Sequence, residues 1–268
     1  MRIVDFFAHP VAAPDEGRLF DLSPAEVEAS ISRYTLELGA HGVSHIMLTF
    51  FDDRIFDSPE IVTRLGQARQ TGLFSYSYLP NLRAPNALSR LELASALGFR
   101  SITLHPYLQR IEPSHYDVIV QLVKEAERLG MFVCLCSAYG SRDMYRYHSL
   151  PLAARLAEDS QCPIVLVHGG GAKILEALLL ADAFPQIVLE TSFSLSYWLG
   201  SSVETDFAFA MRKLGPERWL FGSDAPFVSL SAAIEDHLNF FDRHNFSQSD
   251  VEVIMGGGAA SLLEGGCR

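Results

Sequence analysis

The chain has 268 residues, 49% of them apolar, and a formal net charge of −11 at pH 7. This length and apolar content support one large hydrophobic core or two modest ones, and the acidic charge argues against a nucleic-acid or anionic-membrane partner. No apolar run reaches the roughly 20 residues that cross a bilayer, and Asp5, His9 and Pro10 interrupt the N-terminal stretch too early for a secretory signal.

The first predicted strand is the segment RIVDFFAH, which is apolar except for Arg2, Asp5 and His9. Because alternate side chains of a strand point the same way, Asp5, Phe7 and His9 are expected on one face. We interpret Asp5 as structural, holding a nearby hydrogen-bond donor. His9, at the end of the strand, is a candidate site residue.

Seven further β-rich segments alternate with amphipathic helical patterns along the rest of the chain. The strand segments are SHIMLTFF, LFSYSYLP, RSITLHP, MFVCLCSA, PIVLVHGG, QIVLETSF and WLFGSDAP. The helical ranges are Pro24–Gly39, Pro59–Thr71, Asn86–Leu97, Tyr116–Leu129, Leu150–Asp159, Lys173–Phe184, Ser202–Leu214 and Leu230–His244. Serine followed by proline begins some of these helices and glycine ends others, as is usual at helix boundaries.

Apolar strands that alternate with helices predict a parallel sheet covered by helices. Eight such units in a chain of this length predict an α/β fold, a single (β/α)₈ TIM barrel, with residues 1–268 as one domain. A doubly wound open sheet is the alternative, but no G-x-G-x-x-G motif follows the first strand.

Barrel enzymes carry their chemistry at the carboxyl ends of the strands. The polar residues predicted there are His9, Asp52, Asn81, His105, Cys136, Ser137, His168, Glu190, Ser192 and Asp224. Three histidines together with Asp224 at one mouth favour a functional site over core packing alone. The remaining histidines are interpreted as surface or structural residues; they are His41, His45, His115, His148, His237 and His244.

The cysteine pattern indicates a reducing compartment. Cys134, Cys136, Cys162 and Cys267 form no C-x-x-C pair and no disulfide framework. Cys134 and Cys136 lie two apart in an apolar strand, where buried free thiols are common. We expect a cytoplasmic protein.

Four segments together resemble the metal-dependent amidohydrolase superfamily, and within it amidohydrolase family 2. They are VDFFAHP on the first strand, GFRSITLHP on the fourth, PIVLVHGGG on the sixth and RWLFGSDAPF on the eighth. GGGAASLLE near the end is similar to the closing helix of the family. The resemblance implies a decarboxylase, lactonase or hydratase, often dimeric, with a divalent metal held by residues at the first, fifth and eighth strands.

The chain departs from the family pattern at two of the usual metal-ligand positions. Phe7 stands where the first-strand motif has its first histidine, and Cys136 stands where the fifth strand has one. His9, His168 and Asp224 match the pattern. Phenylalanine ligates nothing, whereas a thiolate is a good zinc ligand, so two possibilities stay open. Either the site has lost its metal or binds it weakly, or one zinc is held by His9, Cys136 and Asp224.

Acid–base chemistry remains available without metal. Asp224 and His168 are the predicted general base and acid, and His9 would polarise the substrate. Hydrolysis of a lactone or activated ester is within reach of this set because the leaving groups are good. If metal is bound, the resemblance implies metal-activated water, and a decarboxylase or hydratase is the alternative.

Arginines and aromatic residues narrow the class of substrate that we expect. The loops after the strands contain Arg54, Arg83, Arg110, Arg142 and Arg146, while lysine is scarce. Guanidinium groups bind carboxylates bidentately, so Arg83 or Arg142 is expected to contact an anionic substrate. The predicted pocket lining is His105, Phe7, Phe51, Tyr78, Tyr107 and Tyr139, with ordinary packing as the alternative for Phe51 and the three tyrosines. The segment HGGG would either hold an anion at a helix start or serve as a tight turn.

A second class of function stays open, because a chain that lost two ligands resembles a retired enzyme. The barrel would then be a binding or scaffolding subunit. We favour an enzyme acting on a small anionic molecule, with a homodimer as the possible assembly.

Overall fold

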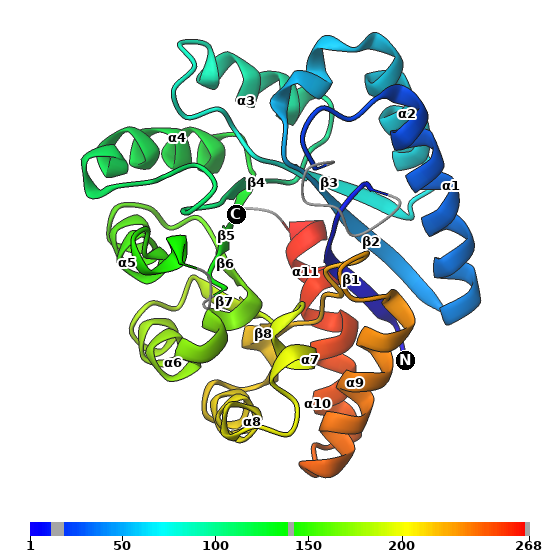
Figure 1. Cartoon of the computed structure of the whole chain (residues 1–268), viewed down its shortest axis with the longest axis vertical. Helices are drawn as coiled ribbons and strands as arrows, with labels where there is room; N and C mark the ends of the chain where they lie inside the picture. The colour runs from blue at the N-terminus through cyan, green and yellow to red at the C-terminus, as the bar shows by residue number, and fades with distance from the viewer. Residues whose placement is uncertain (12–18, 139–141, 266–268) are drawn as a thin grey trace.

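The computed structural model describes residues 1–11, 19–138 and 142–265. Within them, eight parallel strands in sequence order form a barrel surrounded by helices (Figure 1). The strands are β1 Ile3–Ala8, β2 Val43–Phe50, β3 Phe74–Tyr78, β4 Ser101–Leu104, β5 Phe132–Cys136, β6 Ile164–Val167, β7 Ile187–Glu190 and β8 Trp219–Leu220.

The barrel closes between β1 and the segment that follows β8. The Phe6 N–H donates to the Phe221 carbonyl at 3.0 Å, and the Asp224 N–H donates to the Phe7 carbonyl at 2.8 Å. These bonds continue the ladder past the short β8 and leave no open sheet edge there. The predicted (β/α)₈ barrel is therefore confirmed.

Helices alternate with the strands as the sequence pattern predicts. The longer ones are α1 Pro24–His41, α2 Pro59–Gln70, α3 Ala87–Ala96, α4 Tyr116–Arg128, α5 Ser149–Asp159, α6 Ile174–Ala183, α8 Ser202–Leu214 and α9 Leu230–Arg243. The shorter elements include η2 Asp53–Asp57, η4 Asp143–Tyr145, η5 His168–Lys173, α7 Ser194–Trp198, α10 Gln248–Glu252, η7 Val253–Gly257 and α11 Gly258–Gly265. Ser23 and Glu26 form a reciprocal capping box that fixes the start of α1.

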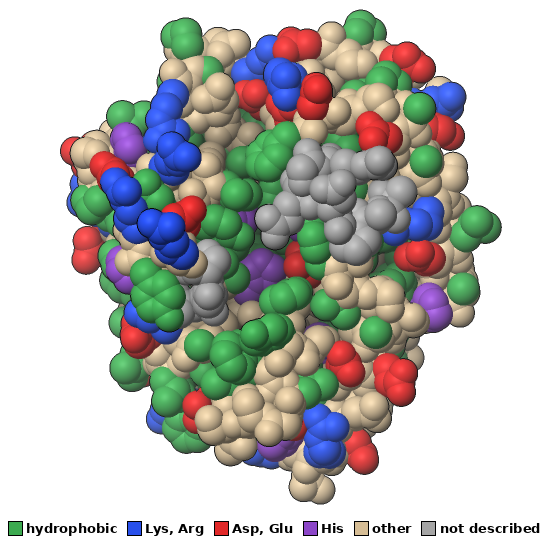
Figure 2. Space-filling model, in the orientation of Figure 1, with side chains coloured by type: hydrophobic (Ala, Val, Ile, Leu, Met, Phe, Trp, Pro, Cys, Tyr) green, Lys and Arg blue, Asp and Glu red, His purple; other side chains and the backbone are tan. Residues whose placement is uncertain are grey.

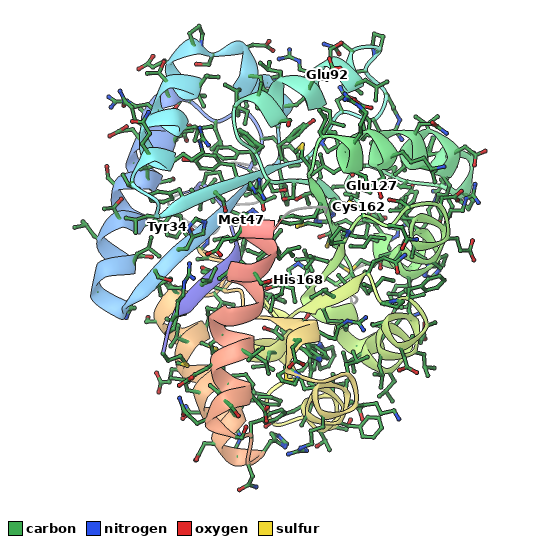
Figure 3. All side chains as sticks on the ribbon, turned by 180° about the vertical axis from the view of Figure 1, so that it is seen from behind. Tyr34, Met47, Glu92, Glu127, Cys162 and His168 are labelled. Carbon is green, nitrogen blue, oxygen red and sulfur yellow. The ribbon has the colours of Figure 1, made fainter. Side chains whose placement is uncertain are left out.

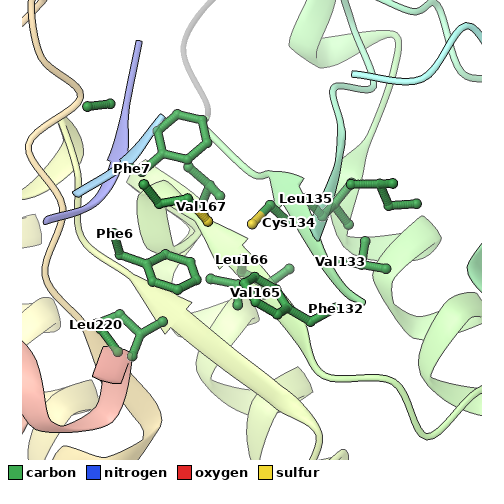
Figure 4. Close-up of a cluster of buried hydrophobic side chains, with 14 of the residues drawn as sticks. Phe6, Phe7, Phe132, Val133, Cys134, Leu135, Val165, Leu166, Val167 and Leu220 are labelled. Carbon is green, nitrogen blue, oxygen red and sulfur yellow. The ribbon is translucent and has the colours of Figure 1, made fainter. Parts of the chain in front are cut away.

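The interior of the barrel is filled by apolar side chains from opposite strands. Phe6 from β1 stacks on Phe132 from β5 with ring centroids 5.6 Å apart (Figure 4). Both side chains are fully buried. This packed layer closes the barrel below its mouth, so chemistry is confined to the ends of the strands.

β1 does not alternate as its sequence predicts. The register between β1 and β2 shifts between Asp5 and Ala8, which is the mark of a bulge. As a result Phe6 packs inside the barrel while the Phe7 ring contacts the His9 ring at the mouth. Phe7 and His9 therefore meet at the mouth as expected, but simple alternation along β1 does not hold, because Phe6 also packs inward.

The Asp5 carboxylate holds the bulge and the barrel closure together. Oδ1 accepts the Ser223 N–H at 2.8 Å and the Phe7 N–H at 3.4 Å, and Oδ2 accepts the Ser223 hydroxyl at 2.6 Å. Asp5 is fully buried, and desolvation raises its pKa to about 7. Its contacts agree with the structural role predicted for it.

Among the described helices, none combines the length and apolar character that a bilayer span requires.

Candidate active site

The predicted strand-end residues gather in a hollow at the carboxyl end of the barrel. Histidine side chains line the floor of this hollow in Figure 2. His9, His105, His168 and Asp224 are all more than nine-tenths buried and come from four different strand ends. We call this hollow the mouth.

His9 and Asp224 form a hydrogen-bonded pair in the mouth. His9 Nε2 lies 3.0 Å from Asp224 Oδ1. An ionised carboxylate only accepts hydrogen bonds, so Nε2 carries the proton. His9 Nδ1 is then a buried acceptor with no partner in the described part of the chain. Asp224 has a φ of 63°, a left-handed conformation that is unusual for a non-glycine residue and clusters at functional sites.

Aromatic rings wall the His9 side chain. Phe7, Phe51 and Phe227 place their ring centroids 5.2, 4.9 and 5.5 Å from that of His9, each in edge-on geometry. The Phe7 ring also lies 5.8 Å from the His168 ring. The two histidines therefore border one apolar surface, on which a charge is weakly screened by water.

His168 is held in one tautomer from behind. Its Nδ1 lies 2.9 Å from the Ser192 carbonyl oxygen, which only accepts, so Nδ1 donates and neutral His168 keeps a lone pair on Nε2. Burial lowers the pKa of His168, so the neutral form dominates at pH 7. His168 has a φ of 70° and thus shares the left-handed conformation of Asp224.

Glu190 supports His168 through Ser192. Oε2 of Glu190 accepts the Ser192 hydroxyl at 2.7 Å and the His168 N–H at 3.1 Å, while Oε1 accepts the Ser192 N–H at 2.7 Å. The Ser192 hydroxyl oxygen is in turn 3.1 Å from His168 Nδ1. Desolvation raises the pKa of the fully buried Glu190 to about 8. Glu190 and Ser192 are predicted at a strand end, but the sequence pattern assigns them no role.

Gly222 makes room for this network, and Gly170 makes room for the packing of the turn after β6 against α6. A Cβ on Gly222 would lie 2.0 Å from Glu190 Oε1, and one on Gly170 would lie 2.7 Å from the Ala177 Cβ. Gly170 also has a φ of 84° and donates its N–H to the Ser137 hydroxyl at 2.8 Å. The segment His168–Gly171 thus forms a tight strand-to-helix turn, one of the two roles predicted for it.

His105 completes the floor of the mouth. Its ring lies 5.4 Å from Phe51 and 4.2 Å from Tyr107, and its Nδ1 is buried without a partner among the described residues. Desolvation and the nearby His168 and His9 lower its pKa well below the usual histidine value. It is a neutral, unsatisfied polar group facing the same hollow as His9.

The side chains at the mouth differ from the usual donor set of a divalent-metal site. In residues 1–11, 19–138 and 142–265, no three His, Cys, Asp or Glu side chains converge as ligands of one ion. Phe7 supplies no donor atom, and His9 directs Nε2 at Asp224. Burial raises the pKa of the Cys136 thiol to about 12 in the metal-free protein, and only a bound metal would make it a thiolate there. His9, His168 and Asp224 can nonetheless act as acids and bases themselves.

Arg83 lies beside the mouth. It lines a cavity of about 220 Å³ together with Phe51, whose ring contacts His9. Its Nη1 donates to the Gln109 carbonyl at 2.8 Å and its Nη2 to the Arg110 carbonyl at 3.3 Å. Backbone carbonyls thus position the Arg83 guanidinium without neutralising its charge.

The other arginines in the loops around the mouth are paired with carboxylates or exposed. Arg54 is ion-paired with Asp52, and Arg146 lies 3.4 Å from a Glu112 oxygen. Arg142 is exposed at the start of η4. In Figure 2, Lys and Arg side chains lie together to the left of the central hollow and above it.

Tyr78 does not line the mouth. Its ring packs 5.0 Å from Phe56 and 5.9 Å from Phe99, on the helix side of β3. Alternation along β3 turns Ser77 into the barrel, where it bonds to Thr103, and turns Tyr78 outward. The interpretation of Tyr78 as substrate-binding is therefore wrong. Tyr139 lies outside the described residues.

Comparison with known proteins finds one matching sequence family and solved structures with the same barrel fold. The family model described as Amidohydrolase matches residues 8–264. No curated protein gives a significant sequence match.

Solved structures share the fold at low identity. A probable 2-pyrone-4,6-dicarboxylic acid hydrolase from Acinetobacter baumannii, with citric acid bound, is 16% identical with a TM-score of 0.69, covering 98% of this chain and 100% of that one. A 2,6-dihydroxybenzoate decarboxylase from Rhizobium is 16% identical with a TM-score of 0.66, covering 98% and 99%. An amidohydrolase from Burkholderia multivorans with bound zinc is 16% identical with a TM-score of 0.69, covering 98% and 99%. At these identities the similarity shows the fold alone.

Proposed function

The chain belongs to the amidohydrolase family whose model it matches over residues 8–264, and we propose that it hydrolyses a small, anionic cyclic ester at the mouth. The proposal rests on one observation above others. A hydrogen-bonded His9–Asp224 pair and a neutral His168 share one apolar-walled hollow.

Asp224 is the proposed general base. As a water oxygen attacks the ester carbonyl carbon, Asp224 takes a proton from that water. The bond between the carbonyl carbon and the ring oxygen then breaks, and Asp224 returns the proton to that oxygen. The product is one opened molecule with a new carboxylic acid and a hydroxyl group. Positioned acid–base catalysis of this kind contributes about 10²- to 10⁴-fold.

His168 and His9 are proposed to hold the reacting groups in place. These roles replace the acid and polarising roles expected from the sequence, because neutral His168 has no proton on Nε2 and the His9 Nε2–H bonds to Asp224. The lone pair on His168 Nε2 accepts the second hydrogen of the attacking water and orients its oxygen. The Nε2–H of His9 fixes one oxygen of Asp224 at 3.0 Å, which aims the other at the water. Both roles require the tautomers that the Ser192 carbonyl and Asp224 impose.

A cyclic ester is favoured over an amide because of the leaving group. An ester oxygen departs more readily than an amide nitrogen, so a base without an accompanying Lewis acid suffices. The neutral imidazoles of His105 and His168 add no positive charge to the mouth. Charge recognition is therefore assigned to the rim, with Arg83 and Arg142 as the proposed contacts for a substrate carboxylate.

Product analysis tests the proposal. The protein is incubated with 2-pyrone-4,6-dicarboxylate and with 2,6-dihydroxybenzoate, the compounds named for two structural neighbours. Ring opening without release of CO₂ supports the hydrolase. Release of CO₂ would support a decarboxylase instead, and turnover of neither compound nor of any related carboxylated lactone would favour a binding subunit.

A further inference from the structure

A second cavity lies at the opposite end of the barrel from the mouth. It has a volume of about 310 Å³ and is bordered by residues that precede β1 and β4, by the end of α2 and by α11. In Figure 3, which shows the molecule from behind, α11 lies across this end of the strands. We call this space the base cavity. Its charged lining residues are Arg2, Arg69, Arg100 and Glu264.

The base cavity is basic in an acidic protein. Three arginines and one glutamate give it a formal charge near +2, whereas the chain carries −11. The one opposing carboxylate is weakly engaged. Arg2 Nη1 lies 3.5 Å from Glu264 Oε1, and both side chains are more than half exposed, so water screens the pair. An anionic ligand would compete only with this weakly paired Glu264 carboxylate for the arginines.

Arg100 has an unsatisfied hydrogen-bond donor beside this cavity. Its side chain is half-buried, and its Nε is a buried donor with no partner in the described part of the chain. A guanidinium nitrogen in such a place costs free energy unless an acceptor reaches it. Arg100 thus places a cationic group at the cavity wall whose hydrogen-bonding capacity is not used up by the described residues.

Arg69 is held in place at the cavity wall. A Cβ on Gly98 would lie 2.6 Å from Arg69 Nη1, so the absence of a side chain there lets the guanidinium rest on the Gly98 backbone. Gly98 has a φ of 84°, which favours glycine at this position for a second reason. The guanidinium is thus placed without a carboxylate partner in the described residues.

His45 fixes the polar wall and stays neutral. Its Nδ1 donates to the Gly72 carbonyl at 2.9 Å, which leaves Nε2 to accept the Ser75 hydroxyl at 2.9 Å. Desolvation and the charge of Arg2 lower the pKa of His45. The positive charge of the cavity therefore comes from the arginines, which stay charged at any working pH.

We propose that the base cavity binds the oxyanion group of a small ligand, a phosphate or a carboxylate, through Arg69 and Arg100. Guanidinium groups recognise both groups by paired hydrogen bonds, and the cavity volume suits a small molecule rather than a polymer. This site is independent of the proposed chemistry at the mouth.

Calorimetric titration with sodium phosphate and, separately, sodium malonate at constant ionic strength tests the proposal. Saturable binding of one probe is expected, and Arg69→Gln and Arg100→Gln should each weaken it about tenfold or more. Arg64→Gln is the matched control, because Arg64 lies on the same helix but pairs with Glu28 outside the cavity. It should leave the affinity unchanged.

The probe that binds with the higher affinity shows whether the site prefers a phosphate or a carboxylate. Arg69→Gln affects an exposed side chain, so its result stands even if Arg100→Gln folds poorly. Absence of saturable binding by either probe would overturn the proposal. A loss of binding in Arg83→Gln with none in Arg69→Gln would also overturn it, because the anion would then sit at the mouth.

Discussion

His9 Nε2 lies 3.0 Å from Asp224 Oδ1, so side chains at the two ends of the barrel's strand sequence meet where the sheet closes. His9 follows β1 and Asp224 follows β8. The hydrogen bonds that close the barrel also bring this pair together, which couples the integrity of the fold to the geometry of the proposed base.

Asp224→Asn should remove the proposed base while keeping the shape of the side chain. We expect kcat to fall by about 10²-fold or more, with a smaller fall for His9→Gln because His9 only positions the carboxylate. Steady-state kinetics on the best lactone substrate measures both. Equal activity of Asp224→Asn and the wild type would remove Asp224 from the mechanism.

Arg83→Gln should weaken recognition of a substrate carboxylate. We expect KM to rise about tenfold with kcat nearly unchanged, because the guanidinium binds ground state and transition state alike. Arg54→Gln is the control, since Asp52 already neutralises that side chain. With a neutral ester of the same substrate, Arg83→Gln and the wild type should have the same KM. If Arg83→Gln and Arg142→Gln both leave KM unchanged, the rim does not recognise the anion.

Gly222→Ala should disrupt the Glu190 network. The new methyl group would lie 2.0 Å from Glu190 Oε1, so the carboxylate must move away from Ser192. We expect a loss of about 1–3 kcal/mol of unfolding free energy in denaturant titrations. Gly66→Ala in α2 is the matched control, because a Cβ added there would have nothing within 4 Å, and it should be neutral or stabilising. A Gly222→Ala protein as stable as Gly66→Ala would contradict this packing.

Stability should fall as pH rises above neutrality, through Glu190. Its pKa is raised to about 8 in the folded protein, so the folded state holds a proton that the unfolded state has already released. The unfolding free energy should therefore decrease by about 1 kcal/mol between pH 7 and 8.5. Glu190→Gln should remove that part of the slope. The buried histidines titrate below this range because their pKa values are lowered, whereas Asp5, with a pKa raised to about 7, adds a smaller decrease of the same sign. An equal or steeper slope in Glu190→Gln than in the wild type would refute the assignment.

Restoring the missing donors should create a metal site. The double variant Phe7→His, Cys136→His adds two imidazoles beside His9 and Asp224, a donor set that suits zinc. Elemental analysis should find near one equivalent of zinc in this variant and substantially less in the wild type. One full equivalent in the wild type, lost in Cys136→Ala, would instead make Cys136 a ligand.

The barrel could be predicted from the sequence because its signals are local. Alternating apolar strands and capped helices give eight units, and the helices α1 to α6, α8 and α9 begin or end within a few residues of their predicted bounds. The segment WLFGSDAP differs most from its expected form. Only Trp219–Leu220 forms β8, because backbone bonds to β1 replace regular pairing and Asp224 turns left-handed.

The site is only partly predictable, because its contacts join distant residues. His9, His168 and Asp224 follow from strand-end positions, but the bulge in β1 depends on Ser223, more than 200 residues away. Glu190 gains its role only when Gly222 leaves space for it. The position of Tyr78 could not be predicted, because the face of β3 that turns inward cannot be read from a strand whose two faces are both buried.

The most direct test of the proposed chemistry is the hydrolysis rate of carboxylated lactones by protein freed of metal with a chelator. The acid–base mechanism predicts that kcat/KM is unchanged by the chelator and is lost in Asp224→Asn. A rate that disappears with the chelator and returns with added zinc would contradict it, and would return the chain to the metal-dependent chemistry of its family.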